Sequence, residues 1–578
     1  MVYRVADNII SPLGESTAQN YEAVKQGLTR LQRYELHGEA YVASRFSAIS
    51  VIPGMTRFES LAIRSIRQAL GDAKIDPTSE RVVLILSTTK GNIEKIQTGN
   101  TQGISPGAAA RHIAQELHVS TEPIAVCNAC ISGVSAIVLA GRLLENDDYD
   151  YAIVCGADVL TPFTISGFQS LKALSDAVCR PFDIERLGLN LGEAAATMIL
   201  SREPSGDGWG IENGIIRNDA FHISSPSKNG EGARLALEAV LKDCDPNTLS
   251  FINAHGTATM FNDQMESVAI ERAGLGNIPV NALKGYFGHT LGAAGILETI
   301  LSIAAANDHT VLGTKGFKEI GVSGKIQLSA AHNKTDKLSF VKMISGFGGG
   351  NGALLVTQDT LGERLRAGRT LGDWLLRSQT QVPVPKCAPL CPKCAPLCQT
   401  KRRLSITPTE VILDGHKLDT QATGKALLTE LYKRFVGDYP KFYKMDGLSR
   451  LGFIGAELLD PAESHDSMGI VLVNRSSSIE ADMVYQASIA DPASYFPSPA
   501  AFVYTLPNIV TGEIAIRHQI HGETAFYILP EKDEATIDRL LRASLADPQL
   551  QMLIGGWVDY EDETHFEAEM YLIEKVKK

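Results

Sequence analysis

Two cysteines three residues apart are the first candidates for chemistry in this sequence. Cys127 and Cys130 lie in EPIAVCNACISGVSAIVLAGRLL, where the apolar run before Cys127 predicts a buried strand and the stretch after Cys130 predicts a helix. At a helix N-terminus the dipole favours a thiolate, and backbone N–H groups can hold an oxyanion. The spacing alone leaves four possibilities open: a nucleophile with a bystander, a redox pair, half a metal site, or two buried structural cysteines.

Two histidines and a glycine loop add to this chemistry. His255 follows an apolar strand in INAHGTATMFNDQME, and His289 precedes a Gly/Ala-rich helix in NALKGYFGHTLGAAGILETI. A single histidine after a strand is more often structural than catalytic, and the loop in ISGFGGGNGALLV leads into a strand rather than into the helix that a phosphate-binding loop needs. Taken together, one cysteine, two loop histidines and a glycine loop indicate acyl transfer through a thioester.

The elements that must position these residues alternate along the chain. Up to about residue 357, strand-like runs such as RVVLILSTT and DYAIVCGADVL are separated by helix-like stretches such as FESLAIRSIRQALGDA. This alternation predicts an α/β architecture with a largely parallel sheet. Residues 358–404 form a boundary, with an amphipathic helix in LGERLRAGRTLGDWLLRSQ followed by a Pro/Cys stretch, and residues 405–578 again have an α/β pattern.

A tandem copy of PKCAPLC lies in this boundary and places four cysteines in a C-x3-C-x2-C-x3-C spacing: Cys387, Cys391, Cys394 and Cys398. Four thiolates could bind zinc. However, zinc ribbons and fingers usually separate their two ligand pairs by a longer folded loop, and the prolines of the repeat restrict folding around one ion. We therefore predict a proline-stiffened linker without stoichiometric zinc.

The overall composition limits the possible classes of function. The 578 residues include 54 basic and 66 acidic side chains, and the net charge of −12 argues against a nucleic-acid-binding protein, which would need a basic surface. No apolar run approaches the roughly 20 residues of a membrane span, and the first residues lack the pattern of a signal peptide. We therefore expect a cytoplasmic protein with reduced cysteines.

A weak internal repeat links the last part of the chain to the first. VVLILSTTKGNIE resembles GIVLVNRSSSIEA, and the alignment of Ser87 with Ser476 gives an offset of 389. The same offset places Gln519 at the position of Cys130 and aligns a glycine three residues later, which predicts the start of a helix at Gln519. Two matches at one offset suggest two related folds in one chain.

Residues 1–357 resemble the β-ketoacyl-acyl-carrier-protein synthases of the elongating type. The motifs that carry the resemblance occur in the family's order: CNACISG, CRPFDIERLGLNLGEAA, NAHGTATMFND, KGYFGHTLGAAG and GFGGGNGA. The third and fourth motifs are very specific. The resemblance implies the duplicated, five-layered α-β-α-β-α thiolase-like fold, with two halves at about 1–205 and 206–357.

The resemblance also implies a reaction. Cys130, His255 and His289 would form a Cys-His-His triad, in which Cys130 accepts an acyl chain, the histidines stabilise an enolate formed by loss of CO2 from malonyl carrier protein, and Cys127 is a bystander. The product would be a 3-oxoacyl carrier protein of a fatty acid, polyene or polyketide pathway. The chemistry implies no metal and no cofactor apart from the phosphopantetheine on which the acyl carrier protein holds its substrates.

Further residues receive roles from the same resemblance. Lys284 and Glu193 would support the histidines, and Thr257 and Thr259 would contact the pantetheine arm. Phe347 would gate access to the nucleophile and supply, together with the nucleophile itself, the backbone N–H groups of an oxyanion hole. Two positions depart from the family pattern, since glycine stands for threonine in FGGGN and alanine for glycine in GEAA. The region is also short for the family, which leaves the size of the acyl pocket open.

Residues 405–578 resemble the front half of the same fold. YPKFYKMDGLSRLGFIGAELL matches the lead-in helix and IVLVNRSSSIEAD the strand after it, whereas no HGT, GHT or GFGG segment follows. Chain-length-factor subunits, which pair with active synthases, often have glutamine at the nucleophile position. With Gln519 at that position, this part of the chain resembles them. We therefore expect the acyl carrier protein as a partner, and a homodimer or a heterodimer with another ketosynthase-like subunit. The half fold should dock against a synthase part of the same or a neighbouring chain, because its exposed apolar face needs a partner.

Two other readings remain open from the sequence. The protein could be a non-catalytic partner within a synthase complex, or a thiolase-like acyltransferase that does not decarboxylate its substrate. Both would retain a thiolase-like fold, so the sequence pattern alone does not separate them from a condensing enzyme.

Overall fold

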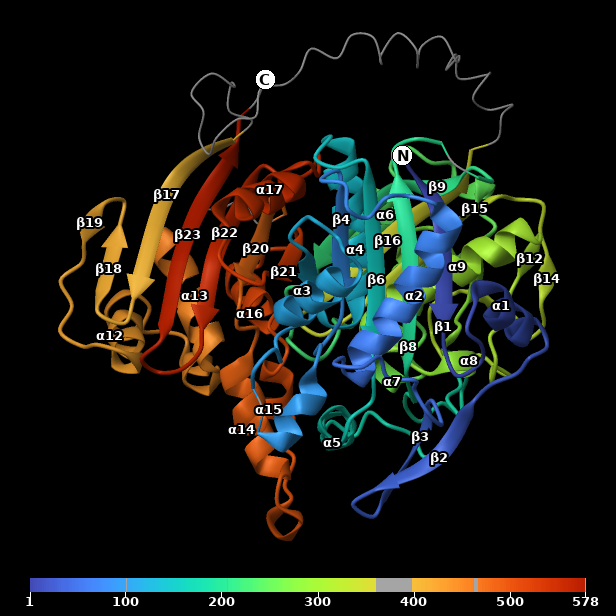
Figure 1. Ribbon diagram of the computed structural model, residues 1–578, viewed down its shortest axis with the longest axis horizontal. Coiled ribbons are helices and arrows are strands. Elements are labelled where there is room, and N and C mark those ends of the chain that lie inside the picture. The colour runs from blue at the N-terminus through green and yellow to red at the C-terminus, as the bar shows by residue number, and fades with distance from the viewer. Residues whose placement is uncertain (100, 205, 360–397, 462–465, 577–578) are drawn as a thin grey trace.

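The computed structural model describes residues 1–99, 101–204, 206–359, 398–461 and 466–576 (Figure 1). A first sheet of the N-terminal part contains, in order, β1 (Val2–Ile10), β8 (Ala194–Ser201), β6 (Tyr151–Asp158), β4 (Val82–Ser87) and β5 (Ile124–Val126). Strands β6, β4 and β5 are parallel because helices connect them, whereas β8 pairs antiparallel with β6 and β1.

A second sheet lies behind the first. It contains, in order, β9 (Trp209–Asn218), β16 (Gly350–Gln358), β15 (Ser339–Ser345), β10 (Phe251–Asn253), β11 (Pro279–Asn281) and β13 (Gln327–Leu328). Strand β16 is antiparallel to both of its neighbours, and β15, β10, β11 and β13 are parallel. A short pairing of β1 with β9 joins the two sheets at one edge.

Helices complete five layers, as the resemblance predicts. Helices α4 (Ser132–Glu145) and α9 (Ala294–Asn307) lie between the sheets and are apolar almost all round, as fully buried helices are. Gly133 and Gly295 allow their close approach, since a Cβ on Gly295 would lie 2.7 Å from the backbone nitrogen of Val134. The outer layers are α2 (Arg57–Ala73) and α3 (Pro106–Glu116) on one side and α6 (Glu231–Val240) and α7 (Met260–Arg272) on the other.

Shorter elements surround this core. They are α1 (Thr17–Lys25), β2 (Leu31–Leu36), β3 (Glu39–Ser44), α5 (Pro162–Ser170), β7 (Leu191–Gly192), α8 (Lys284–Phe287), β12 (Thr310–Val311) and β14 (Asn333–Lys334). Strands β2, β3 and β7 form a small separate sheet, and β12 pairs with β14. No helix among the described residues is long and apolar enough to cross a membrane.

The C-terminal part repeats the first sheet. Its strands are, in order, β21 (Thr524–Ile528), β20 (Met468–Asn474), β22 (Met552–Tyr560), β23 (Phe566–Lys575), β17 (Cys398–Thr407), β18 (Glu410–Leu413) and β19 (His416–Lys417). Its helices are α12 (Lys425–Phe435), α13 (Gly447–Leu459), α14 (Ile479–Ile489), α15 (Pro499–Tyr504), α16 (Ile509–His518) and α17 (Glu534–Leu545). The parallel strands β21, β20 and β22 followed by antiparallel β23 and β17 match the order of β5, β4, β6, β8 and β1. The predicted half fold is therefore present.

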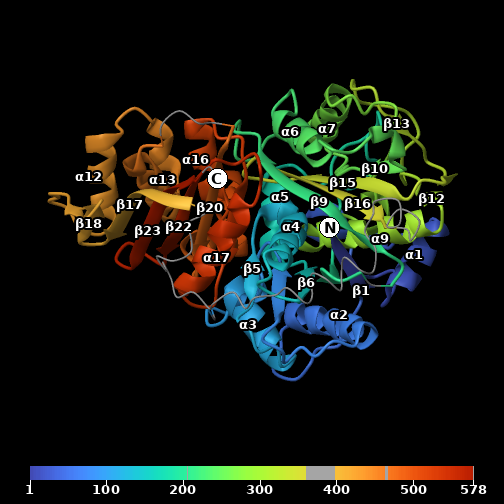
Figure 2. The same cartoon turned by 90° about the horizontal axis from the view of Figure 1, so that it is seen from above.

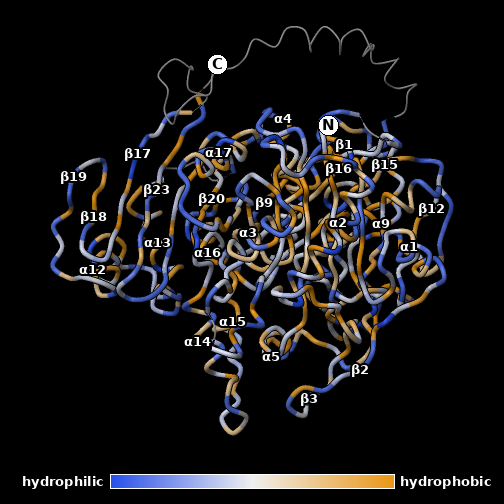
Figure 3. The backbone as a smooth tube through the Cα atoms, viewed as in Figure 1, coloured by the Kyte–Doolittle hydropathy of each residue, from blue (hydrophilic) through white to orange (hydrophobic). Residues whose placement is uncertain are grey.

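The two parts are joined edge to edge within one chain. Strand β21 pairs antiparallel with β5, so that Tyr527 faces Val126 and Ile528 faces Ala125, and one sheet runs through both parts (Figures 1 and 2). Helix α17 packs beside α4, and apolar side chains of both parts form shared buried clusters. Figure 3 shows hydrophobic residues along the backbone in the interior of both parts. The apolar face of the half fold is thus covered by the N-terminal part.

Among the residues that the structure describes, three buried ion pairs cross this interface. Lys90 pairs with Asp482, Arg142 with Glu523 at 2.6 Å, and Arg217 with Asp547 at 2.6 Å. Each of these side chains is at most 10% exposed. If one partner were removed, water could not solvate the remaining buried charge. The interface therefore has the character of a protein interior.

The predicted alignment of Gln519 with Cys130 is wrong. Gln519 follows the end of α16 in a left-handed conformation (φ 51°), and no helix begins there. The pairing of β5 with β21 relates α4 to α17, which begin at Ser132 and Glu534. Lys532 therefore occupies the position of the nucleophile, where its ammonium lies 3.5 Å from Glu567 and 3.4 Å from Glu569.

The predicted boundary of the linker also changes. Strand β17 begins at Cys398, so residues 398–404 belong to the sheet of the C-terminal part rather than to the linker. Cys398 pairs with Lys575 of β23 in this sheet. The expected amphipathic helix and the other three cysteines of the repeat lie outside the described residues, and the absence of zinc there stays a prediction.

Candidate active site

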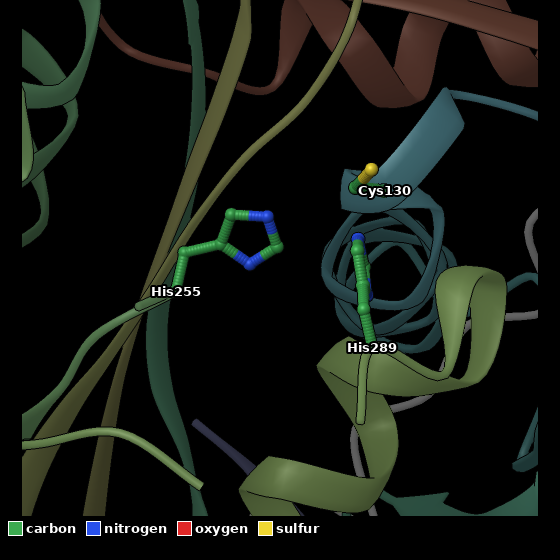
Figure 4. A group of neighbouring side chains, drawn as sticks. All are labelled: Cys130, His255 and His289. Carbon is green, nitrogen blue, oxygen red and sulfur yellow. The ribbon is translucent and has the colours of Figure 1, made fainter. Parts of the chain in front are cut away.

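Cys130 lies on a sharp turn between a strand and a helix. The turn Ala129–Ile131 connects β5 to α4, and Ala129 adopts a positive φ of 49° to reverse the chain. The hydroxyl of Ser132 tightens the turn, because it accepts from the N–H of Asn128 at 2.8 Å and donates to the carbonyl of Ala129 at 2.6 Å. The turn places the thiol of Cys130 at the start of α4, where it faces two histidines (Figure 4).

The three predicted triad residues converge. His255 follows β10 and His289 follows α8, and Sγ of Cys130 and a ring nitrogen of each histidine all lie within 4.8 Å of one another. The two imidazole rings stand edge to face, with centroids 4.9 Å apart and planes at 82° (Figure 4). Cys130 is more than a hundred positions from either histidine in the sequence, and the fold brings all three residues into one site.

Both histidines are placed to donate a hydrogen bond in their neutral form. The backbone N–H of Leu291 donates to Nδ1 of His289 at 3.3 Å, which leaves the ring proton on Nε2. That Nε2 atom, and Nδ1 of His255, are buried and have no partner in the described part of the chain. Burial, and then the nearby charge of Lys284, lower the pKa of both imidazoles well below the ordinary value. The site thus holds two neutral N–H donors.

Burial also has the largest effect on the pKa of the Cys130 thiol. It raises the pKa of Cys130 to about 12, although Lys284 and the backbone N–H groups of Cys130 and Phe347 act in the opposite direction. The resting side chain is a thiol, so the expected preference for a thiolate at the helix N-terminus is outweighed. The same two backbone N–H groups are directed at Sγ of Cys130.

A buried cluster of three charges lies beside the histidines. The carboxylate of Glu298 accepts from Lys284 at 2.7 Å and from Lys342 at 2.5 Å, and Lys342 also contacts the carbonyl of Ala254, next to His255. Burial opposes ionisation of Glu298, but the two ammonium groups lower its pKa. Of these three residues, only Lys284 belongs to a motif that carries the family resemblance. A lone lysine in the apolar run SFVKMIS and a lone glutamate in GILETILSIAAA are the signals that could have identified the other two.

Glu193 has a different place from the one predicted. Its buried carboxylate accepts from the N–H groups of Phe46 and Leu160, each at 2.9 Å, and lies 3.2 Å from the guanidinium of Arg57. No hydrogen bond joins it to either imidazole in the described part of the chain. Its neighbour Gly192 donates to the carbonyl of His289 at 2.9 Å, so Glu193 reaches that histidine only through the backbone.

The remaining predicted residues line a common cavity. A cavity of about 340 Å³ contains the triad at its wall together with Thr257, Thr259 and Phe347, and the two threonine hydroxyls lie 2.9 Å apart. Phe347 and Cys130 also line a second cavity of about 20 Å³, together with Phe502 and Leu506 of the C-terminal part. Phe347 thus stands between the two spaces.

Comparison with known protein families shows the family to which this chain belongs. Residues 9–205 match the beta-ketoacyl synthase N-terminal domain and residues 211–318 match the beta-ketoacyl synthase C-terminal domain, and together these matches cover more than half of the chain. The chain belongs to the β-ketoacyl synthase family. The matches include all three residues of the converging site.

Two bacterial synthases are similar to this chain in sequence. A 3-oxoacyl-[acyl-carrier-protein] synthase 2 from Vibrio cholerae is 27% identical and aligns over 60% of this chain and 96% of its own length. A protein of the same name from Staphylococcus aureus is 28% identical over 52% of this chain and 81% of its own length. Both alignments leave a large part of this synthase uncovered.

Solved structures extend the comparison to both parts. A ketosynthase in complex with its chain length factor from Xenorhabdus doucetiae is 26% identical and covers 62% of this chain and 98% of its own, with a TM-score of 0.57. The structure named PfaC keto synthase-chain length factor covers 99% of this chain and 78% of its own, with a TM-score of 0.73 at 14% identity. At that identity the second comparison shows the fold alone, and it includes the C-terminal part.

Two local features of this synthase follow from packing and charge. Glycine at position 350, where the family usually has threonine, leaves room for Ile131, because a Cβ there would lie 2.7 Å from Cδ1 of that side chain.

The triad has the donor types of a metal site. However, the ammonium of Lys284 lies close enough to lower the pKa of both histidines, so it would also repel a metal cation.

Proposed function

We propose that this protein is a 3-oxoacyl-acyl-carrier-protein synthase that extends an acyl chain by decarboxylating condensation with a malonyl group. The observation that carries the proposal is the convergence of Cys130, His255 and His289, with a buried and unpartnered nitrogen on each ring in the part that the structure describes. A thiol beside two neutral N–H donors suits both acyl transfer to sulfur and stabilisation of an enolate. The names of the aligned relatives support the same reaction.

In the first step, Sγ of Cys130 would attack the thioester of an acyl carrier protein. A new S–C bond forms, the bond to the pantetheine sulfur breaks, and the departing thiolate receives the thiol proton. The N–H groups of Cys130 and Phe347 would hold the negative charge that develops on the carbonyl oxygen. The acyl chain would extend past Phe347 towards the cavity that Phe502 and Leu506 line.

In the second step, a malonyl carrier protein would enter the larger cavity. The carboxylate leaves as CO2, and the electron pair of the broken C–C bond forms an enolate. The ring N–H groups of His255 and His289 would hold the enolate oxygen, which requires that both imidazoles are neutral. The enolate carbon then attacks the acyl carbonyl, a new C–C bond forms, the C–S bond to Cys130 breaks, and the released thiolate takes up a proton from solvent.

The carrier protein is the proposed partner at the mouth of the larger cavity. Thr257 and Thr259 line this cavity, and we propose that their hydroxyls bind the pantetheine arm. Leu187, Met260 and Phe261 also line it and are 72%, 54% and 77% exposed. Exposed apolar side chains that gather in this way are typical of a protein-interaction site.

The proposed reaction uses no resident metal or redox cofactor. Every bond change in it is polar, and Cys130, the two histidines and the backbone N–H groups provide the groups that it needs. It takes place in the cytoplasm, where a catalytic thiol stays reduced. Residues 398–576 take the place of a second ketosynthase-like subunit, because β21 already occupies the edge of β5.

Malonyl decarboxylation by the purified protein tests the proposal. We expect His255→Ala and His289→Ala each to lose at least about 100-fold in release of CO2 from malonyl carrier protein, because an enolate donor is removed. Both variants should still load an acyl group on Cys130, as intact-mass measurements would show. A wild-type protein that loads acyl groups without decarboxylation would instead be a thiolase-like acyltransferase, and one that does neither would be a non-catalytic partner.

The pH dependence of decarboxylation tests the protonation of the histidines. Their lowered pKa values keep both rings neutral at neutral and mildly acidic pH. We therefore expect the rate of CO2 release to stay within about two-fold between pH 7.5 and pH 6, where an ordinary histidine becomes largely protonated. A rate that halves near the ordinary histidine pKa of 6.5 would contradict the neutral pair.

A further inference from the structure

The loop that carries Phe347 is held by two asparagine amides. Asn508, which precedes α16 in the C-terminal part, donates from Nδ2 to the carbonyl oxygen of Phe347 at 2.8 Å. Asn218, the last residue of β9, donates from Nδ2 to the carbonyl oxygen of Gly348 at 2.8 Å. Two consecutive carbonyl groups are thus fixed, one by each part of the chain. These bonds hold the two peptide planes that follow Phe347 and Gly348. The N–H of Phe347 lies on the preceding plane, which is joined to them at the Cα of Phe347, so the bonds restrict the loop beside the nucleophile.

Two glycines make this contact possible. Gly348 has a positive φ of 87°, and a Cβ on it would lie 2.5 Å from Nδ2 of Asn508. Gly512, on α16, packs against the same loop, and a Cβ there would lie 2.7 Å from the carbonyl oxygen of Gly348. Any side chain at either position would push α16 away from the loop. The backbone of the C-terminal part therefore touches the backbone of the site directly.

The burial of Asn508 indicates that its amide has a specific purpose. The residue is 5% exposed, and its Oδ1 atom is buried without a partner in the described part of the chain. An unsatisfied buried oxygen is unfavourable, so an apolar residue would pack here at lower cost. Among the described residues, the bond from Nδ2 to Phe347 is the one hydrogen bond of this amide, and an apolar residue could not replace it.

We propose that Asn508 is a positioning residue for acyl transfer. By holding the peptide plane that follows Phe347, it limits rotation at the Cα of that residue, and so keeps the N–H of Phe347, on the preceding plane, directed at the oxyanion that forms on the acyl group at Cys130. The inference rests on the proposed function, and it assigns the C-terminal part a contribution to the reaction although that part has lysine at the nucleophile position. Decarboxylation does not depend on this N–H, because the enolate oxygen is held by the histidines.

Two variants of the full-length protein test the role. Asn508→Ala removes the amide, and Asn508→Asp keeps its size but removes the N–H donor. We expect both to lower the first-order rate of Cys130 acylation by about ten-fold or more, which is less than the loss of an entire oxyanion donor. The concentration of acyl carrier protein that gives the half-maximal rate, and the rate of malonyl decarboxylation, should both stay within about two-fold of wild type, because neither depends on the Phe347 N–H.

Tyr485→Phe is the matched control. It removes another buried hydrogen bond across the same interface, between Tyr485 and Ser166 at 3.0 Å, and leaves the loop untouched. It should retain the wild-type acylation rate. Acylation unchanged in both Asn508 variants, a parallel loss of acylation and decarboxylation, or an equal loss in Tyr485→Phe would overturn the positioning role. A wild-type protein that neither loads acyl groups nor decarboxylates malonyl carrier protein would overturn the proposed function, and this inference with it.

Discussion

Cys130→Ala is expected to abolish acyl loading and to lower condensation by roughly 10³-fold or more, because no acyl-enzyme can form without the thiol. Intact-mass measurement after incubation with an acyl carrier protein should show one acyl group on the wild-type chain and none on the variant. Condensation can be followed in the same samples as the 3-oxoacyl product. The substitution removes one buried sulfur atom, so the variant should remain folded.

Cys127→Ala is the matched control for this experiment. Cys127 is fully buried, its N–H donates to the carbonyl of Phe526 at 3.2 Å, and it lines neither of the two cavities beside Cys130. Burial raises the pKa of both thiols, so the access of Cys130 to the cavities distinguishes the two residues. We expect this variant to keep most of its acyl loading. Equal losses in the two variants would show that the cysteines act as a pair.

Arg217→Met is expected to destabilise the whole chain by about 3–5 kcal/mol, because it leaves the buried carboxylate of Asp547 without its partner. The two side chains are 3% and 0% exposed and lie on opposite sides of the interface. Urea unfolding followed by tryptophan fluorescence and circular dichroism would measure the change. Since the parts share one sheet and common apolar clusters, both signals should shift together.

Two further variants make this prediction specific. Arg217→Met combined with Asp547→Leu should recover most of the lost stability, because no buried charge remains unpaired. Arg539→Met removes a half-exposed ion pair with Asp148 across the same interface and should cost less than about 1 kcal/mol. Separate unfolding transitions, with the N-terminal part unaffected by Arg217→Met, would show that the two parts fold independently.

Much of the N-terminal part could be predicted from local sequence. The strand before Cys130, the helix after it and the turns that carry His255 and His289 are encoded in short segments. Their apolar periodicity and small residues therefore indicate each element without knowledge of the rest of the chain. The motif order was sufficient to expect five layers and a converging triad. The front-half pattern of the C-terminal part was also visible, because its lead-in helix and first strand have the same local signals.

Long-range pairing decided what the sequence left open or misplaced. The offset that aligns Ser87 with Ser476 does not persist to the next strand and helix, because the connections differ in length, and only the pairing of β5 with β21 identified Lys532 rather than Gln519. Glu298 and Lys342 come together from a helix and a strand of different layers. Asn508 reaches Phe347 from another part of the chain. Each of these contacts depends on how distant elements pack, which a local pattern does not contain.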